Sequence, residues 1–196
     1  MAEIRSTIDL VMERAAKMGR ATPEEMELDS ANQKGRQYAA EYLNEKKGPL
    51  TEMLAKESSN MQNEVRKGML DVLLRNLFLA RDDPGFERVG CALTGLIELG
   101  GGGGDIAGIC QELQGIIGQY SKHRKQYYEQ LKEQILMQIE QVVAMKTGSS
   151  VEGLNIDPTI EPKFKEEWAR IEGELNGQYE QVLNQYREQL SMRLGA

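Results

Sequence analysis

The sequence is poor in the side chains that most often build metal and catalytic sites. Its 196 residues include one histidine, His123, and two cysteines, Cys91 and Cys110. The cysteines form no C-x-x-C pair, and a single histidine is too few to complete an ordinary zinc site with them. Both cysteines lie among apolar residues, which favours buried, reduced thiols, because a disulfide needs an oxidising compartment. We therefore expect no metal and no cofactor.

The sequence also lacks an excess of basic residues and any long apolar run. Lys and Arg number 24 and Asp and Glu 31, which gives a net charge of −7. Nucleic-acid binders and proteins that dock on anionic lipid depend on clustered basic residues, so we expect no nucleic-acid partner. The most apolar window, "VGCALTGLIEL" (89–99), is too short to span a membrane. The first residues have no continuous apolar core of the signal-peptide kind. We expect a cytoplasmic protein without membrane insertion.

Few residues favour strands, and the five prolines divide a chain whose apolar residues recur at helical spacing. Each proline stands where a helix can begin, as its fixed φ and missing N–H require. "TPEEM" adds a capping box, with Thr22 before Pro23 and Glu25 three positions after Thr22. The pattern predicts helices over about 3–18, 23–47, 50–81, 85–99, 105–146 and 162–194. The second of these is very polar near Gly35, where we expect it to fray or break.

The last two predicted helices are unusually long. An unbroken helix over 105–146 would span about 60 Å, and the segment between it and 162–194 is long enough to let the two fold back on each other. The fold class is therefore all-α, a helical bundle with a long antiparallel C-terminal helical hairpin. We divide the chain into an N-terminal helical region (1–99), a glycine linker (100–104) and the hairpin (105–196). The two regions could also form one domain.

Five consecutive glycines, Gly100, Gly101, Gly102, Gly103 and Gly104, form the most unusual stretch of the sequence. A phosphate-binding loop would need a preceding strand and usually a lysine, and neither is present. Asp105 would also place a negative charge where a phosphate should lie. Because ordering five glycines costs much backbone entropy, we interpret the run as a flexible turn or hinge. A Gly102→Ala change is expected to alter mobility more than ligand binding.

Tyrosines interleaved with glutamine mark the two long helices. Amphipathic rings suit a half-wet helix–helix seam, whereas a base-stacking platform does not fit the acidic composition. His123 shows no partnership with a Ser or Cys nucleophile, so we interpret it as a solvated residue in a small basic patch. The candidate interaction residues are Tyr120, Tyr127, Leu131, Trp168, Tyr179 and Tyr186.

The opening stretch "EIRSTIDLVMERAAKM" (3–18) resembles the start of a family of small uncharacterised bacterial helical proteins. The shared feature is the apolar seam of Ile4, Ile8 and Val11. The resemblance implies a helical structure and a bacterial origin, and it assigns no residue roles, because the function of that family is unknown.

Two classes of function fit these features. The first is a non-enzymatic helical interaction or scaffold protein that self-associates through its long helices or binds a helical protein partner. This hypothesis is motivated by the apolar faces of the two long helices, which are larger than a single bundle can bury. The second is a small-ligand-binding protein or enzyme with a site between helices, which would use carboxylates, tyrosines or Cys110. A pocket with convergent polar groups would favour the second class.

Overall fold

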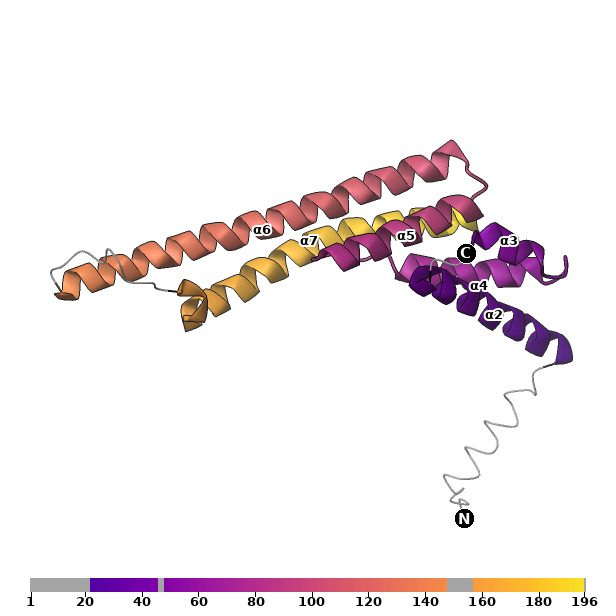
Figure 1. Ribbon diagram of the computed structural model, residues 1–196, viewed down its shortest axis with the longest axis horizontal. Coiled ribbons are helices and arrows are strands. Elements are labelled where there is room, and N and C mark those ends of the chain that lie inside the picture. Colours follow the sequence, from indigo (N-terminus) through magenta and orange to yellow (C-terminus); the bar gives the residue numbers. More distant parts are fainter. Residues whose placement is uncertain (1–21, 46–47, 148–156, 196) are drawn as a thin grey trace, which may run out of the picture.

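The computed structural model describes residues 22–45, 48–147 and 157–195, and the all-α prediction is confirmed over these residues (Figure 1). The predicted helix 3–18, which also carries the resemblance noted above, lies outside the described residues. The elements are α2 (Pro23–Glu45), α3 (Leu50–Ala55), α4 (Gln62–Arg75), α5 (Asp83–Leu99), α6 (Gly104–Thr147), the 3-10 helix η1 (Pro158–Ile160) and α7 (Pro162–Leu194).

Side-chain caps stabilise the starts of α2 and α5, and a proline occupies the first turn of α7. At α2 the Thr22 N–H donates to Glu25 Oε2 at 2.8 Å, and the Glu25 N–H donates to Thr22 Oγ1 at 3.2 Å. These two bonds form the predicted capping box. At α5 the Asp82 carboxylate accepts the Gly85 N–H at 2.8 Å. Pro162 stands at the first turn of α7, where its missing N–H costs nothing.

The single helix predicted over 50–81 is wrong, because the chain forms two helices there. α3 ends at Ala55, and α4 begins only at Gln62. Between them lies "KESSN", in which serine and asparagine side chains compete with the backbone for hydrogen bonds and so disfavour a helix interior. α4 then ends at Arg75, where the Asn76 side chain donates to the Val72 carbonyl at 2.7 Å.

α2 continues through Gly35 without the predicted break. A Cβ atom built on Gly35 would lie 1.9 Å from the Val65 carbonyl oxygen, and one on Gly68 would lie 2.0 Å from the Asn32 carbonyl oxygen. The two glycines therefore let the backbones of α2 and α4 cross in close contact. α3 and α5 complete this compact group of helices, which we call the body (α2–α5).

The glycine run forms the turn between α5 and α6. The Gly101 N–H donates to the Glu98 carbonyl at 3.1 Å, and the Gly102 N–H donates to the Ile97 carbonyl at 3.0 Å. This pair of bonds is a Schellman motif, and it requires a left-handed residue after the helix. Gly101 has φ +72° and Gly102 has φ +69°, backbone angles that residues other than glycine rarely adopt. The turn therefore has a defined backbone, and hinge motion at Gly100–Gly104 stays a prediction.

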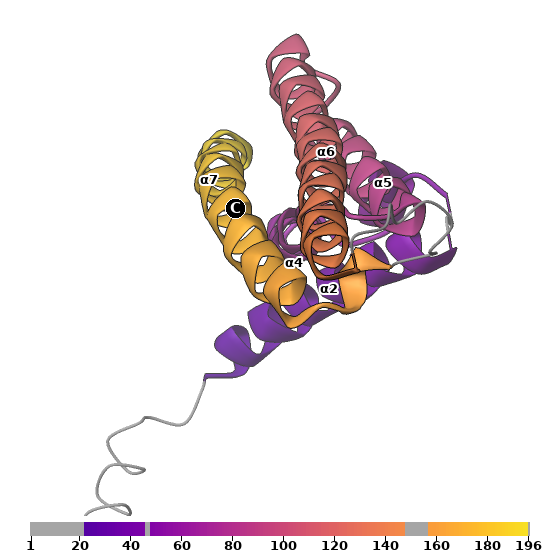
Figure 2. The same ribbon diagram turned by 90° about the vertical axis from the view of Figure 1, so that its left-hand side faces the viewer.

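α6 and α7, which we call the long pair, lie side by side and run in opposite directions (Figure 1). The contacts between them follow one another in reverse order: Asp105 binds Arg193 near the turn, Tyr120 binds Asn176 midway, and Gln138 binds Lys163 at the far end. Figure 2, which looks at the long pair from its far end, shows α6 and α7 standing in front of the body.

The main core joins the body to the near end of the long pair. It contains buried residues of α2, α4 and α5 together with Ile106, Leu113 and Ile117 of α6 and Leu183 and Leu190 of α7. A separate, smaller cluster lies at the far end: Leu131, Ile135 and Phe164 are its buried residues, and we call it the distal cluster. The far end of the long pair therefore extends beyond the body, and its own small cluster packs α6 against α7.

Candidate interaction site

The sequence-predicted interaction residues lie along the long pair, and the structure brings most of them into the seam between α6 and α7. Tyr120 is fully buried, and its hydroxyl donates to Asn176 Oδ1 at 2.7 Å. Its ring meets that of Tyr179 edge to face, with centroids 5.3 Å apart. Tyr186 lies against the main core, and its hydroxyl donates to Glu112 Oε2 at 2.9 Å. These three tyrosines hold the two helices of one chain together.

Polar contacts form a band across the middle of the long pair. The Tyr179 hydroxyl and His123 Nδ1 are 2.7 Å apart. Arg124 Nε donates to Glu172 Oε1 at 2.8 Å, and Arg81, which precedes α5, lies 3.6 Å from the same carboxylate oxygen. Charged and hydroxyl groups of this band pair with one another, so their chemistry fixes the register of α6 on α7.

The distal cluster contains the other predicted anchors. Leu131 is buried beside Ile135 and Phe164. Trp168 packs on this cluster, its ring lying edge to face with that of Tyr128 at 5.0 Å and beneath the Arg124 guanidinium at 5.4 Å. Edge-to-face pairs and a cation over an indole ring each add to the apolar contact.

Tyr127 differs from the other predicted residues because its side chain is 43% exposed. Its ring centroid lies 6.4 Å from that of His123, one turn earlier on α6. Among the six predicted interaction residues, Tyr127 therefore presents the most ring surface to solvent.

Beyond the distal cluster, α6 is longer than its partner. Ile139 still packs on the distal cluster, and η1 contacts α6. α7 begins at Pro162, and Lys163 Nζ donates to Gln138 Oε1 at 2.7 Å, so residues 139–147 of α6 extend past this contact. We call these residues the overhang; it is visible at the left of Figure 1. Apolar side chains at this end are exposed: Val142 by 50%, Met145 by 85% and Ile160 of η1 by 66%.

An open groove of about 380 Å³ runs along the base of the overhang. Its apolar floor comes from α6, and its polar edge comes from Gln138 and from the residues on either side of Pro162. The lining residues are Ile135, Gln138, Ile139, Val142, Val143, Glu161 and Lys163.

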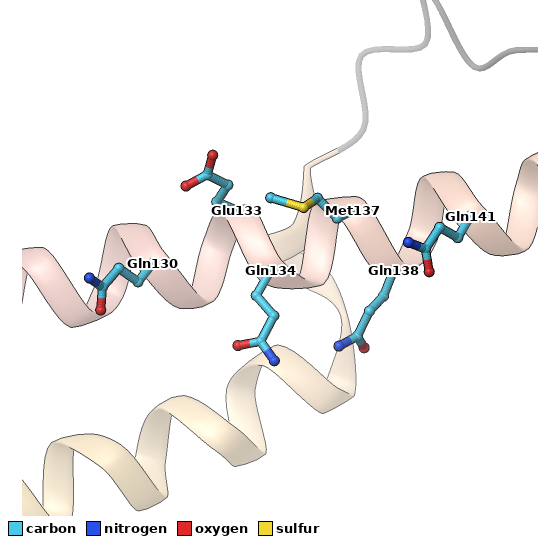
Figure 3. Close-up of a pocket in the computed structure, with 6 residues that line it drawn as sticks. All are labelled: Gln130, Glu133, Gln134, Met137, Gln138 and Gln141. Atoms are coloured by element: carbon cyan, nitrogen blue, oxygen red, sulfur yellow. The ribbon is translucent and has the colours of Figure 1, made fainter.

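A second groove, of about 320 Å³, lies on α6 alone and is rich in glutamine (Figure 3). In this view Gln134 and Gln138 point toward α7, whereas Glu133 and Met137 point away from it. Gln130 and Gln141 complete the lining. Amide groups both donate and accept hydrogen bonds, so this face can pair with polar groups of many kinds.

A third groove, of about 480 Å³, opens on the body beside Tyr42, Cys91 and Glu98. The Glu98 carboxylate accepts the Leu50 N–H at 3.0 Å and the Tyr42 hydroxyl at 3.4 Å. Burial and the neighbouring Glu98 raise the pKa of Tyr42 well above its usual value. The carboxylate of Glu98, a residue of α5, thus binds the first N–H group of α3 and a tyrosine of α2, and it connects the three helices.

The part of the chain that the structure describes holds no group of three or more His, Cys, Asp or Glu side chains arranged to bind a metal ion. Cys110 is buried in the main core, and burial raises the pKa of its thiol to about 11. None of the helices, over their described residues, combines the length and the apolar character that crossing a membrane requires.

Sequence reasoning missed the residues that join the long pair to the body. Arg66 of α4 donates from Nη1 to the Leu194 carbonyl at 2.6 Å and from Nη2 to the Leu99 carbonyl at 3.1 Å. It therefore binds the C-terminal ends of both α7 and α5. Arg187 of α7 donates to the Leu77 carbonyl just after α4. The spacing of basic residues along one helix carries no signal for such contacts between helices.

Comparison with known proteins gives one match. Residues 51–192 match a protein family whose description is "Family of unknown function (DUF6657)". The match includes α4 to α7 and excludes the opening stretch that carried the sequence resemblance. No curated protein matches the chain, and no solved structure does.

Proposed function

The chain belongs to the DUF6657 family, whose function is unknown, and we propose that it is a non-enzymatic helical interaction protein that self-associates through its long helices. The observation that carries this proposal is the exposed apolar surface at the far end of α6. Val142 and Met145 lie on the overhang with half or more of their side-chain surface in solvent. Exposed apolar groups gathered at one end of a molecule favour an interaction site.

The shape of the molecule supports the same proposal. The body and the near end of the long pair share one core, whereas the far end projects beyond it with only the small distal cluster inside (Figure 1). A projecting pair of helices adds little to the stability of the body, but it displays helical faces at a distance from it. Such an arrangement suits contact with a second helical surface.

Sedimentation velocity over a range from micromolar to near-millimolar protein tests the proposal. We expect the average mass to rise with concentration toward that of a dimer or a larger assembly. A chain that stays monomeric over the whole range would contradict self-association. The same series in high salt separates apolar contact, which salt does not weaken, from surface charge pairing, which it screens.

The alternative is a small-ligand-binding protein or enzyme that uses the groove beside Tyr42, Cys91 and Glu98. The observation in its favour is that this groove is the most spacious of the three and has two carboxylates, Glu87 and Glu98, in its lining. A thermal-shift screen with small cationic metabolites tests it. Stabilisation that Glu87→Gln removes would favour the alternative, and a screen without any such compound would count against it. The absence of a nucleic-acid partner remains a prediction from the acidic composition, and a cytoplasmic location remains a prediction from the lack of a signal-peptide core and of a long apolar run.

A further inference from the structure

We infer that the overhang of α6 is covered by the same overhang of a second copy of this chain, in an antiparallel contact with two-fold symmetry. This inference rests on the proposed self-association and names its surface and its partner. The occupant is thus a helix of known sequence, length and chemistry.

The exposed side chains of the overhang continue the apolar seam of the long pair. Ile135, Ile139 and Val142 follow at spacings of four and three, so they lie on the same side of α6. Ile135 is 3% exposed against α7, whereas Val142, two turns further along, is 50% exposed. The difference arises because α7 begins too late to reach Val142. A face that packs against α7 over most of its length therefore ends against only the short helix η1, which leaves Val142 half exposed.

The charges beside the overhang favour a copy of the same surface. The groove at its base carries one acidic residue, Glu161, and one basic residue, Lys163. A two-fold axis brings the acidic residue of each copy toward the basic residue of the other, so neither charge lacks a counterpart. A partner with charge of a single sign would face one attractive and one repulsive group.

One of the neighbouring glutamines has the same self-complementary character. Gln134, Gln138 and Gln141 lie beside the apolar side chains of α6 (Figure 3). Gln134 and Gln138 point toward α7, and Gln138 already accepts from Lys163. Gln141 is exposed on the overhang, and because its amide has both a donor and an acceptor it can hydrogen-bond to its counterpart in a second copy. The rim of the contact is then polar and its centre apolar, as is usual for protein interfaces.

The size of the overhang sets the strength of the contact. Nine residues of helix are about 13 Å long, so the contact is small beside the roughly 800 Å² per partner of a standard interface. We therefore expect a reversible dimer that dissociates on dilution. Ile160 of η1, which is 66% exposed, enlarges the apolar area at the same end.

Two matched methionines give a direct test. Met145 on the overhang is 85% exposed, and Met192, near the opposite end of the long pair on α7, is 75% exposed. Met145→Glu places like charges close to each other across the proposed two-fold axis, whereas Met192→Glu adds the same charge elsewhere. We expect Met145→Glu to raise the dimer dissociation constant by about tenfold or more, and Met192→Glu to leave it close to that of the wild type. Circular dichroism of both variants verifies that these exposed changes leave the helices intact.

Crosslinking tests the geometry. Met145→Cys and Met192→Cys are treated separately with a short bis-maleimide, with Cys91 and Cys110 present in both proteins. Efficient dimer crosslinking by Met145→Cys alone supports the overhang contact. Equal or stronger crosslinking by Met192→Cys overturns it.

The outcomes separate this inference from the proposed function. A wild-type chain that is monomeric at every concentration overturns both. A dimer that Met145→Glu leaves intact keeps the self-association but overturns the overhang as its surface. A dimer that is lost when residues 1–21 are removed, but not in Met145→Glu, assigns the contact to the N-terminal segment and also overturns the inference.

Discussion

Gly35 and Gly68 show how single residues determine the approach of two helices in the body. Each lies where the other helix passes close by, and an added Cβ would lie 1.9 Å from a carbonyl oxygen at Gly35 and 2.0 Å at Gly68, well inside the 3.0 Å below which non-bonded Cβ atoms are essentially never found. Both oxygens belong to the backbone, which moves less readily than a side chain. The two glycines therefore cost some intrinsic helix stability and gain a tighter packing of α2 on α4.

We predict that Gly35→Ala and Gly68→Ala each destabilise the chain by about 3 kcal/mol, because overpacking forces α2 and α4 apart. Gly177→Ala on α7 is the matched control, since a Cβ there meets nothing within 4 Å. It should stabilise the chain by up to about 1 kcal/mol through helix propensity. Denaturant unfolding measures all three, and equal effects of Gly35→Ala and Gly177→Ala would contradict the close crossing.

Glu57 gives a pH dependence whose sign follows from its contacts. Its carboxylate accepts the Lys34 ammonium at 2.8 Å and the Tyr38 hydroxyl at 2.6 Å, and these bonds lower the pKa of Glu57 below its ordinary value of 4.5. The folded state therefore holds this proton less tightly than the unfolded state. The resulting stabilisation is present above pH 4.5 and is lost as the pH falls through the lower, folded-state pKa.

We predict that Glu57→Gln is less stable than the wild type at neutral pH and that the difference narrows on acidification below pH 4.5. Urea unfolding at a series of pH values measures it. Glu129→Gln, on an exposed position of α6, removes the same charge without these two partners and serves as the control. A gap between wild type and Glu57→Gln that widens on acidification would show that the sign is wrong.

At the scale of elements, the sequence predicted the helices that local signals define. A proline marks the start of both α2 and α7, α2 has a capping box in addition, and both helices begin where predicted. The uninterrupted helix over 105–146 is likewise observed as α6, in which no proline interrupts the apolar spacing. In these cases the decisive interactions lie within a few residues of one another.

Two wrong predictions have a common origin in contacts between distant residues. Gly35 was expected to break α2. Its lack of a side chain instead allows α4 to pass close by, with the Val65 carbonyl nearest to it, and Val65 is 30 positions away along the chain. The break between α3 and α4 lies in a loop from which Glu57 reaches back to Lys34 and Tyr38 on α2. Hydrophobic spacing alone does not contain these pairings.

Arg66 joins three helices, and its substitution tests how strongly the long pair is attached to the body. The carbonyl groups at the C-terminal ends of α5 and α7 have no partner within their own helices, and the Arg66 guanidinium binds both. We predict that Arg66→Met costs about 2 to 3 kcal/mol, since it leaves partly buried carbonyl groups without a donor. Denaturant unfolding measures the loss.

The control for Arg66 is Arg170→Met on α7. Arg170 is 60% exposed, and it pairs with Glu167 and Glu174 of the same helix. Exposed pairs of this kind contribute well under about 1 kcal/mol. If Arg66→Met and Arg170→Met lowered the free energy of unfolding by similar amounts, the hydrogen bonds of Arg66 would contribute no more than an exposed ion pair. The long pair would then be held to the body by apolar packing.

At the scale of the whole molecule, two apolar clusters are separated by a polar band. The main core unites the body with the near end of the long pair, and the distal cluster lies beyond the paired groups of Tyr120, His123 and Arg124. The candidate anchors could be found from the sequence because aromatic and leucine residues repeat along the long helices. That Tyr127 would be the exposed one could not be found from the sequence, because its exposure depends on which face of α6 is covered by α7.

This division predicts a gradient of local stability along α6. The near end, around Leu113 and Ile117, belongs to the large core, whereas the far end, around Leu131 and Ile135, is held by three buried residues and their neighbours. Local openings that expose little buried surface cost less than global unfolding, so amide exchange should be about tenfold faster or more at the far end in dilute protein.

The dependence of amide exchange on protein concentration distinguishes a weakly held helix end from an interaction site. If the overhang binds a second copy, raising the protein concentration should slow exchange over residues 139–145 and leave the rates around Leu113 unchanged, because binding stabilises only the conformation that binds. Met145→Glu should abolish the concentration dependence, while Met192→Glu should preserve it. Exchange at the far end that is slow in dilute protein and independent of concentration would mean that the distal cluster alone orders this end, and the exposed apolar side chains would then need no partner.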